Sequence, residues 1–173
     1  FQRSVSVSAS MLRIVRARRW QTFADGAIAH PPRGGTVAAM RILLVGDTHA
    51  NTAWWEQFVR PAAEQLAVDA ICQLGDFGFW PSASAFLEAA ATGPVPTFFL
   101  DGNHEHHVAL DARVATARAL HGCGPVDPVP FGDQLWFMPR GTRVVWGDVA
   151  VAALGGARSI DRALRRVGKD WFV

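Results

Sequence analysis

From residue 40 onward, short apolar runs alternate with stretches of helical periodicity. Each apolar run ends at glycine or aspartate, which is typical of strands buried on both faces. The runs are RILLVG (41–46), DAICQLGD (69–76) and PTFFLDGN (96–103). Helical patterns cover residues 53–67, 82–91 and about 106–120. Strands separated by helices of this length indicate βαβ units and a mostly parallel sheet.

The pattern changes near residue 130. The segment QLWFMPRGTRVVWGDVAVAALGG (134–156) predicts two or three strands joined by PRG and GD turns. Such turns favour hairpins, and hence an antiparallel or mixed second sheet. In the first helix, Asn51 is a candidate N-cap, and Pro61 is expected to kink or break the helix.

Composition agrees with one globular domain. The chain has 173 residues, of which 50% are hydrophobic and 18% are charged, so a disordered chain is excluded. No apolar run approaches the roughly 18 residues that a membrane span requires. Its two cysteines, Cys72 and Cys123, supply neither a disulfide framework nor a four-ligand zinc site. We therefore expect a cytoplasmic protein without a membrane partner, and we expect Cys72 to be buried as a small hydrophobe.

Charge is distributed unevenly along the chain. Residues 1–39 carry six arginines against the single acid Asp25, whereas residues 40–173 carry a net charge of −3. Such a leader could bind nucleic acid or resemble a transit peptide, but its apolar residues keep no helical period and HPPRGG interrupts it. We therefore expect residues 1–39 to be a basic leader that is disordered or foreign to the native protein. The domain proper would begin at Met40.

Polar side chains gather where the three predicted parallel strands end. Asp47 and His49 follow the first strand, Asp76 follows the second, and Asn103 and His104 follow the third. The carboxyl ends of neighbouring parallel strands lie side by side, so these side chains can converge on one crevice. An aspartate at a strand end is often only a helix cap. Three such motifs on successive strands favour a functional site.

The donor types in this set indicate a metal site. Carboxylate and amide oxygens with an imidazole nitrogen suit Mn²⁺ best here, with Fe or Zn²⁺ as alternatives. A carboxylate such as Asp76 can bridge two ions about 3.5–4 Å apart. The expected cofactors are therefore two divalent metal ions.

These motifs resemble the signature of the calcineurin-like metallophosphoesterase family. The matching segments are GDTH (46–49), GD (75–76), GNHE (102–105) and LGGARSID (154–161). The resemblance covers about residues 41–161 and implies an α/β fold, a two-sheet sandwich flanked by helices. It also implies a metal-dependent phosphoesterase that hydrolyses phosphate monoesters or diesters.

Carried over by position, the resemblance assigns metal ligands. Asp47 and His49 would bind the first metal, Asp76 would bridge, and Asn103 would bind the second metal. An activated water would then attack phosphorus in line.

The resemblance also implies roles around the metals. His104 would be the catalytic residue, because it would protonate the leaving group or stabilise the phosphoryl oxygens. Asp101 and Glu105 would orient His104 or the ligands, although Glu105 could equally be structural. The substrate would be a small phosphoester or a phosphoprotein. A nucleic-acid partner would rest on the basic leader alone, and the oligomeric state is left open.

One departure from the family pattern is clear. The family completes its site with three later histidines, in GH and GHxH motifs, whereas no histidine follows His121 in this chain. We therefore expect the amino-terminal portion of a phosphoesterase domain, over residues 40–173 and incomplete at its C-terminus. The alternative is a catalytically silent remnant that acts as a binding or regulatory module.

Two further features have a structural and a functional reading. His106 and His107 extend the third motif to HEHH, and a solvated helix start explains them better than metal binding. Most tryptophans are expected in the core. For Trp80 alone, just after GDFGF and near the crevice, contact with substrate is an alternative to core packing.

Overall fold

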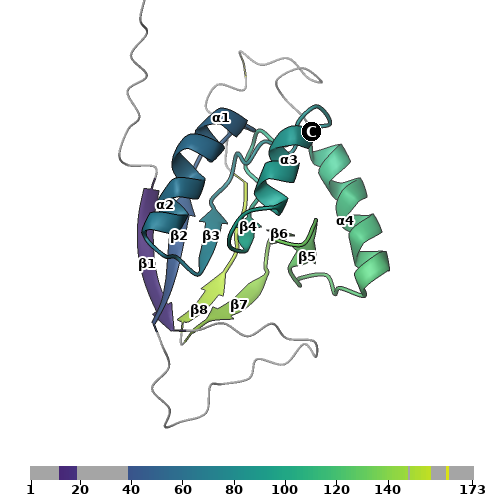
Figure 1. The fold of residues 1–173 in the computed structure, drawn as a ribbon. Coiled ribbons are helices and arrows are strands. Elements are labelled where there is room, and N and C mark those ends of the chain that lie inside the picture. The colour runs from purple at the N-terminus through teal and green to yellow at the C-terminus, as the bar shows by residue number, and fades with distance from the viewer. Residues whose placement is uncertain (1–11, 19–38, 148, 157–162, 164–173) are drawn as a thin grey trace, which may run out of the picture.

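A computed structural model describes residues 12–18, 39–147, 149–156 and 163. Its main feature is a six-stranded sheet in the order β1-β2-β3-β4-β6-β5. The strands are β1 (Leu12–Arg18), β2 (Ala39–Val45), β3 (Ala70–Gln73), β4 (Thr97–Phe99), β5 (Val129–Pro130) and β6 (Leu135–Phe137). Figure 1 shows helices α1, α2 and α3 lying over this sheet.

The three predicted central strands are confirmed. Strands β2, β3 and β4 are parallel neighbours, with Leu44 opposite Cys72 and Cys72 opposite Phe98. All residues of β3 and β4 are buried, as are most of those of β2, which is why their sequences are mainly apolar. On β4, Phe98 packs on one side of the sheet and Phe99 on the other. Cys72 is buried as expected.

The first predicted helix forms without a break, although with a local change of winding. It consists of α1 (Thr52–Trp54), a π-helical segment η2 (Trp55–Val59) and α2 (Arg60–Gln65). The Asn51 side chain accepts a hydrogen bond from the Trp54 N–H at 3.0 Å, which confirms the predicted cap. Pro61 lies in the first turn of α2. Because proline has no N–H and crowds the preceding turn, we attribute the wider π turn ahead of it to Pro61.

The two later helices follow the predicted pattern. Helix α3 spans Ser84–Ala91, and α4 spans His107–His121. His106 caps α4, since its Nδ1 accepts from the Ala109 N–H at 3.2 Å. Gly122 ends the helix at φ +68°. His106 and His107 are thus the N-cap and the first residue of a helix, as predicted.

The expected second sheet has two strands among the described residues. Strands β7 (Arg143–Trp146) and β8 (Val149–Ala152) form an antiparallel hairpin. Strand β6, however, pairs in parallel with β4 in the main sheet, so the PRG turn carries the chain between the two sheets and closes no hairpin. Strand β5, which the sequence pattern did not predict, pairs antiparallel with β6.

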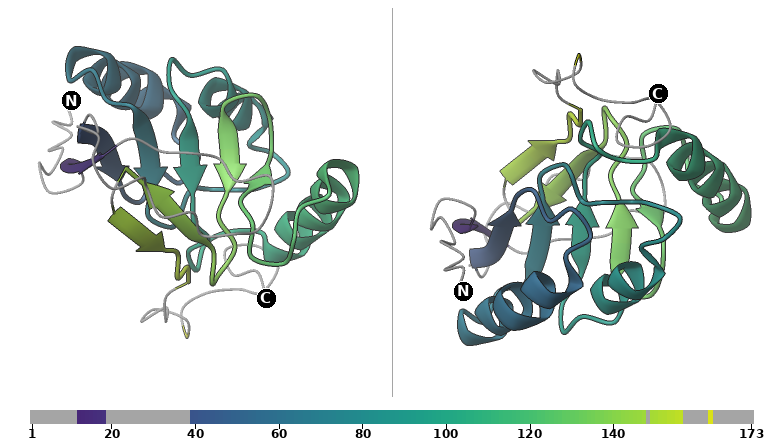
Figure 2. Two further views of the ribbon diagram at one scale, coloured as in Figure 1. Left: turned by 90° about the horizontal axis from the view of Figure 1, so that it is seen from below. Right: turned by 90° about the horizontal axis from the view of Figure 1, so that it is seen from above.

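The layers of the domain create two cores. Figure 2 shows the helices α1 to α3 on one face of the main sheet and the β7-β8 hairpin on the other. Trp55 and Phe86 of the helical layer pack with Phe99. On the opposite face, Trp146 packs with Phe98. This two-sheet α/β sandwich with flanking helices confirms the predicted fold class.

Part of the basic leader forms a strand that the sequence pattern did not predict. The β1 backbone pairs antiparallel with β2 from Leu12 opposite Val45 to Arg18 opposite Ala39. The rest of residues 1–38 lies outside the described residues. The division into a leader and a domain at residue 40 stays a prediction.

Candidate metal centre

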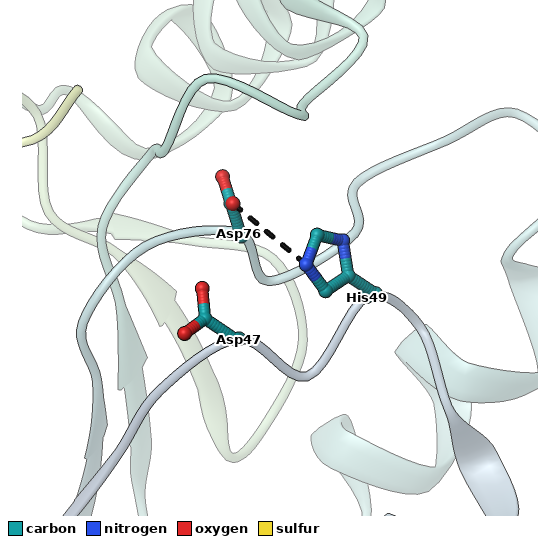
Figure 3. Close-up of side chains that lie close together, drawn as sticks. All are labelled: Asp47, His49 and Asp76. Atoms are coloured by element: carbon teal, nitrogen blue, oxygen red, sulfur yellow. Dashed lines mark ion pairs between the residues drawn. The ribbon is translucent and has the colours of Figure 1, made fainter. Parts of the chain in front are cut away.

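Three predicted ligands meet at the carboxyl edge of the main sheet. Asp47 and His49 lie in the loop after β2, and Asp76 lies in the loop after β3. One ligand atom of each lies within 4.8 Å of those of the others. Figure 3 shows the three side chains directed toward one another. Among the described residues, no other group of three His, Cys, Asp or Glu side chains is gathered in this way.

The cluster is open on one side and anchored on the other. The Nε2 atom of His49 lies 3.7 Å from Oδ2 of Asp76, and these side chains are 41% and 13% exposed. Asp47 is exposed. The other oxygen of Asp76, Oδ1, accepts a hydrogen bond from the His104 backbone N–H at 3.0 Å. The loop after β4 therefore fixes the carboxylate that lies deepest in the cluster.

The backbone at the cluster adopts an uncommon conformation. Asp47, His49 and Asp76 have φ values of 50°, 46° and 52°, in the left-handed region. Side chains there cost about 1–3 kcal/mol each, and Asp and His tolerate the region better than most residues. Strain of this kind persists only where the surroundings hold the chain in place.

Backbone hydrogen bonds join the first two loops. The His49 N–H donates to the Asp76 carbonyl at 2.9 Å, and the Ala50 N–H donates to the Phe77 carbonyl at 3.0 Å. Gly78, at φ +93°, lies so close to Ala50 that a Cβ would overlap the Ala50 backbone nitrogen. Glycine at position 78 is thus required for this close approach.

Glu105 joins the second and third loops. Its side chain is completely buried, and Oε1 accepts from the N–H groups of Phe77 at 2.7 Å and Gly78 at 3.3 Å. Oε2 accepts from the Gly102 N–H at 2.7 Å. Burial raises the pKa of Glu105 to about 7, although the three N–H donors act in the opposite direction. Glu105 therefore connects the backbone of the second loop, at Phe77 and Gly78, with that of the third loop, at Gly102.

Asn103 and His104 lie in the loop after β4, next to the cluster. The imidazole of His104 lies 5.1 Å from that of His49, centre to centre, at 71°. A Cβ at Gly102 would overlap both Oδ1 and the backbone nitrogen of Asp76. The third loop is therefore in direct contact with Asp76, and Asn103 follows in sequence.

The comparison with known families can be set beside this geometry. A model of the calcineurin-like phosphoesterases matches residues 40–171. The chain belongs to this family. The match confirms the family predicted from the three strand-end motifs. Searches of curated proteins and of solved structures gave no match.

The residues of this phosphoesterase domain fit a divalent cation. Two carboxylates and an imidazole are a donor set that Mn²⁺, Fe and Zn²⁺ accept. The carboxylates of Asp47 and Asp76 repel each other at this separation, and a cation between them offsets that repulsion. Asp76 has Oδ1 fixed by a backbone N–H, which leaves Oδ2 toward His49. Such support for a ligand is usual in metal sites.

The sequence also predicts that Asp101 orients His104 or the metal ligands. In the structure its side chain pairs with Arg140. Its Oδ2 accepts from Arg140 Nε at 2.9 Å and Nη2 at 2.6 Å. This bond, with the charge of Asp101, raises the pKa of Arg140. The pair joins the end of β4 to the turn after β6. Asp101 directly precedes Gly102, and its predicted role in orienting the site stays a prediction.

Sequence spacing alone does not reveal two features of the site. The left-handed conformation of the ligand positions is a property of the backbone, and the partners of Glu105 lie 27 and 28 residues away in sequence. The glycines at positions 78 and 102, in the segments that carry the motifs, were the available sign that the loop backbones come close together.

Among the described residues, no helix is long and apolar enough to cross a lipid bilayer.

Proposed function

We propose that this domain is a metal-dependent phosphoesterase that hydrolyses phosphate monoesters or diesters through a dinuclear metal centre. The observation that carries the proposal is the cluster of Asp47, His49 and Asp76 at the carboxyl edge of the sheet. Family membership supports the same reaction class.

Each residue has a proposed task. Asp47 and His49 would hold the first cation, Asp76 would contribute to both cations, and Asn103 would hold the second. Divalent cations bound there supply Lewis acidity and an activated water. His104 would give a proton to the leaving oxygen of the ester.

The cofactor and the partners follow from the same chemistry. Mn²⁺ is the proposed metal, with Fe and Zn²⁺ as alternatives, because the donors are oxygen and imidazole nitrogen. The substrate is a small phosphoester or a phosphoprotein. The proposed location is the cytoplasm, in keeping with the free cysteines Cys72 and Cys123.

The test is an assay of the chain on p-nitrophenyl phosphate and bis(p-nitrophenyl) phosphate with Mn²⁺. We expect turnover of at least one ester, and we expect its loss after chelation and in Asp47→Asn. The exposed pair Glu56 and Arg60 offers a control, because Glu56→Gln removes a carboxylate on a helix away from the cluster. Absence of turnover with Mn²⁺, Fe²⁺ and Zn²⁺ would refute the hydrolase proposal.

A binding or regulatory module is the second candidate. Such a module requires only the cluster of Asp47, His49 and Asp76, which could bind a cation without turnover. A module of this kind would bind Mn²⁺ at the cluster but turn over neither ester. The same assay, run beside a metal titration, therefore separates the two candidates.

A further inference from the structure

A small pocket opens beside the candidate metal centre. Its lining includes Ala50, Thr52, Trp80, Ser82, Ala85 and Phe86. Ala50 directly follows the ligand His49, so the pocket and the cluster share one loop. We name this cavity the Trp80 pocket.

Trp80 links the pocket to the cluster. Its indole ring lies 6.4 Å from the imidazole of His49, centre to centre, with the planes inclined by 34°. Its Nε1–H donates to the His104 carbonyl at 2.6 Å. The ring is therefore fixed by the loop that carries the proposed acid. An aromatic side chain held in this way offers a preformed surface for stacking.

The remaining lining suits a flat ring with an apolar body. Phe86 and the alanine side chains supply apolar surface, while Thr52 and Ser82 add two hydroxyl groups. The Ala83 N–H donates to the Trp80 carbonyl at 2.9 Å, which closes the turn that contains Ser82. The rim is thus held by a backbone bond before a ligand arrives.

The size of the pocket limits its occupant. Its volume is about 230 Å³, below the roughly 300–1,000 Å³ typical of sites for drug-sized ligands. One ring system fits this volume better than a folded peptide segment does. Because Ala50 of the pocket directly follows the ligand His49, a ring placed there can belong to the same molecule as a phosphoryl group at the cluster.

We propose that the Trp80 pocket binds a planar aromatic group, an aryl ring or a nucleobase, carried by the phosphoester. This inference rests on the proposed function and narrows its substrate class. The phosphoryl group would lie at Asp47, His49 and Asp76, and the ring would stack against Trp80. Stacking of a base on an aromatic side chain changes affinity by about 5- to 150-fold.

The test compares phosphonates, which the chain cannot hydrolyse at the carbon–phosphorus bond. Calorimetry with Mn²⁺ would measure Kd for phenylphosphonate and methylphosphonate. We expect phenylphosphonate to bind the wild-type chain roughly tenfold more tightly. An adenosine phosphonate forms the third arm, because tighter binding than phenylphosphonate identifies a nucleobase and weaker binding identifies a simple aryl ring.

Two variants of α3 provide the matched pair. Ala85 is exposed and lines the pocket, so Ala85→Leu fills the pocket without disturbing the core. Glu88→Leu adds a similar side chain at another exposed position of the same helix. Ala85→Leu should abolish the preference for the phenyl compound and leave methylphosphonate binding unchanged. Glu88→Leu should keep the preference.

The outcomes separate the two proposals. An equal Kd for both phosphonates in the wild type, or a preference that survives Ala85→Leu, would overturn the Trp80 pocket and leave the proposed function standing. Failure of the wild type to bind either phosphonate, with Mn²⁺ bound, would overturn phosphoryl binding at the cluster and the pocket proposal with it.

Discussion

At Gly102 the backbone lies against the carboxylate of Asp76, and a side chain has no room. A Cβ there would overlap Asp76 Oδ1 and the Asp76 backbone nitrogen. We expect Gly102→Ala to displace Asp76 and to weaken Mn²⁺ binding by about 10–100-fold, as for other changes that disturb the support of a ligand. Isothermal titration with Mn²⁺ measures this.

Gly46 offers the matched control for that variant. It lies next to the ligand Asp47, yet among the described residues no heavy atom lies within 4 Å of a Cβ built there, apart from its chain neighbours. Gly46→Ala should therefore bind Mn²⁺ like the wild type. Equal affinities of the Gly102 and Gly46 variants would contradict the close approach on which the site depends.

Glu105 gives a second prediction for a single residue. In Glu105→Gln one carboxylate oxygen becomes an NH₂ group, which cannot accept from the buried N–H groups of Phe77, Gly78 or Gly102. An unpaired buried donor costs about 1–3 kcal/mol. We expect the free energy of unfolding to fall by that amount in urea titrations.

Glu64 allows the same substitution without buried partners, because it is exposed on α2. Glu64→Gln should change the free energy of unfolding by less than about 0.5 kcal/mol. If the two variants are equally stable, Glu105 does not hold the second and third loops together.

At the scale of elements, the helix after the first motif depends on its cap. The Asn51 side chain accepts from the Trp54 N–H, and Asn51→Ala removes this bond. The loss of an N-cap costs about 1 kcal/mol, which lowers Tm by about 2–4 °C in a chain of this size. Asn51→Asp keeps the acceptor and should melt like the wild type. Calorimetry would contradict this role of Asn51 if the alanine and aspartate variants had the same Tm.

Some elements could be predicted from the sequence and others could not, for a physical reason. Strands β2 to β4 are continuous apolar runs that end at glycine or aspartate, so their local pattern identifies them. Strand β6 has an equally clear pattern, but its pairing with β4 depends on the arrangement of the whole sheet. The two-residue β5 has no pattern long enough to recognise.

The same distinction applies to the site. Asp47, His49 and Asp76 could be predicted to meet, because they follow neighbouring parallel strands. The partners of Asp101 and Glu105 could not, since Arg140 is 39 residues from Asp101 and the N–H partners of Glu105 include distant loop backbone. The roles of Asn103 and His104 stay predictions.

At the scale of the whole molecule, the main sheet separates a helical core from a core between the sheets. Cys72 lies in the second core, 3% exposed, and burial raises its pKa to about 12. Cys123, just after α4, is only partly buried. We expect iodoacetamide at pH 8 to alkylate Cys123 in the native chain and to spare Cys72, because only a thiolate reacts.

Peptide mass spectrometry gives the result of that labelling. In urea both cysteines should react, which shows that protection of Cys72 comes from the fold. Native labelling of Cys72 as fast as Cys123 would mean that the core between the two sheets is open to solvent.

The proposed function requires metal binding at the carboxyl edge of the main sheet. Titration with Mn²⁺, followed by electron paramagnetic resonance, tests this binding most directly. Free Mn²⁺ gives a strong signal that is lost on binding, so the metal bound per chain can be counted. The wild type should bind Mn²⁺ saturably. Asp76→Asn should lose most of that binding, because Asp76 lies within the ligand cluster. His104→Ala should keep it, since His104 donates to Asp76 through its backbone N–H, which alanine retains. Metal retained in Asp76→Asn and lost in His104→Ala would contradict the assignment.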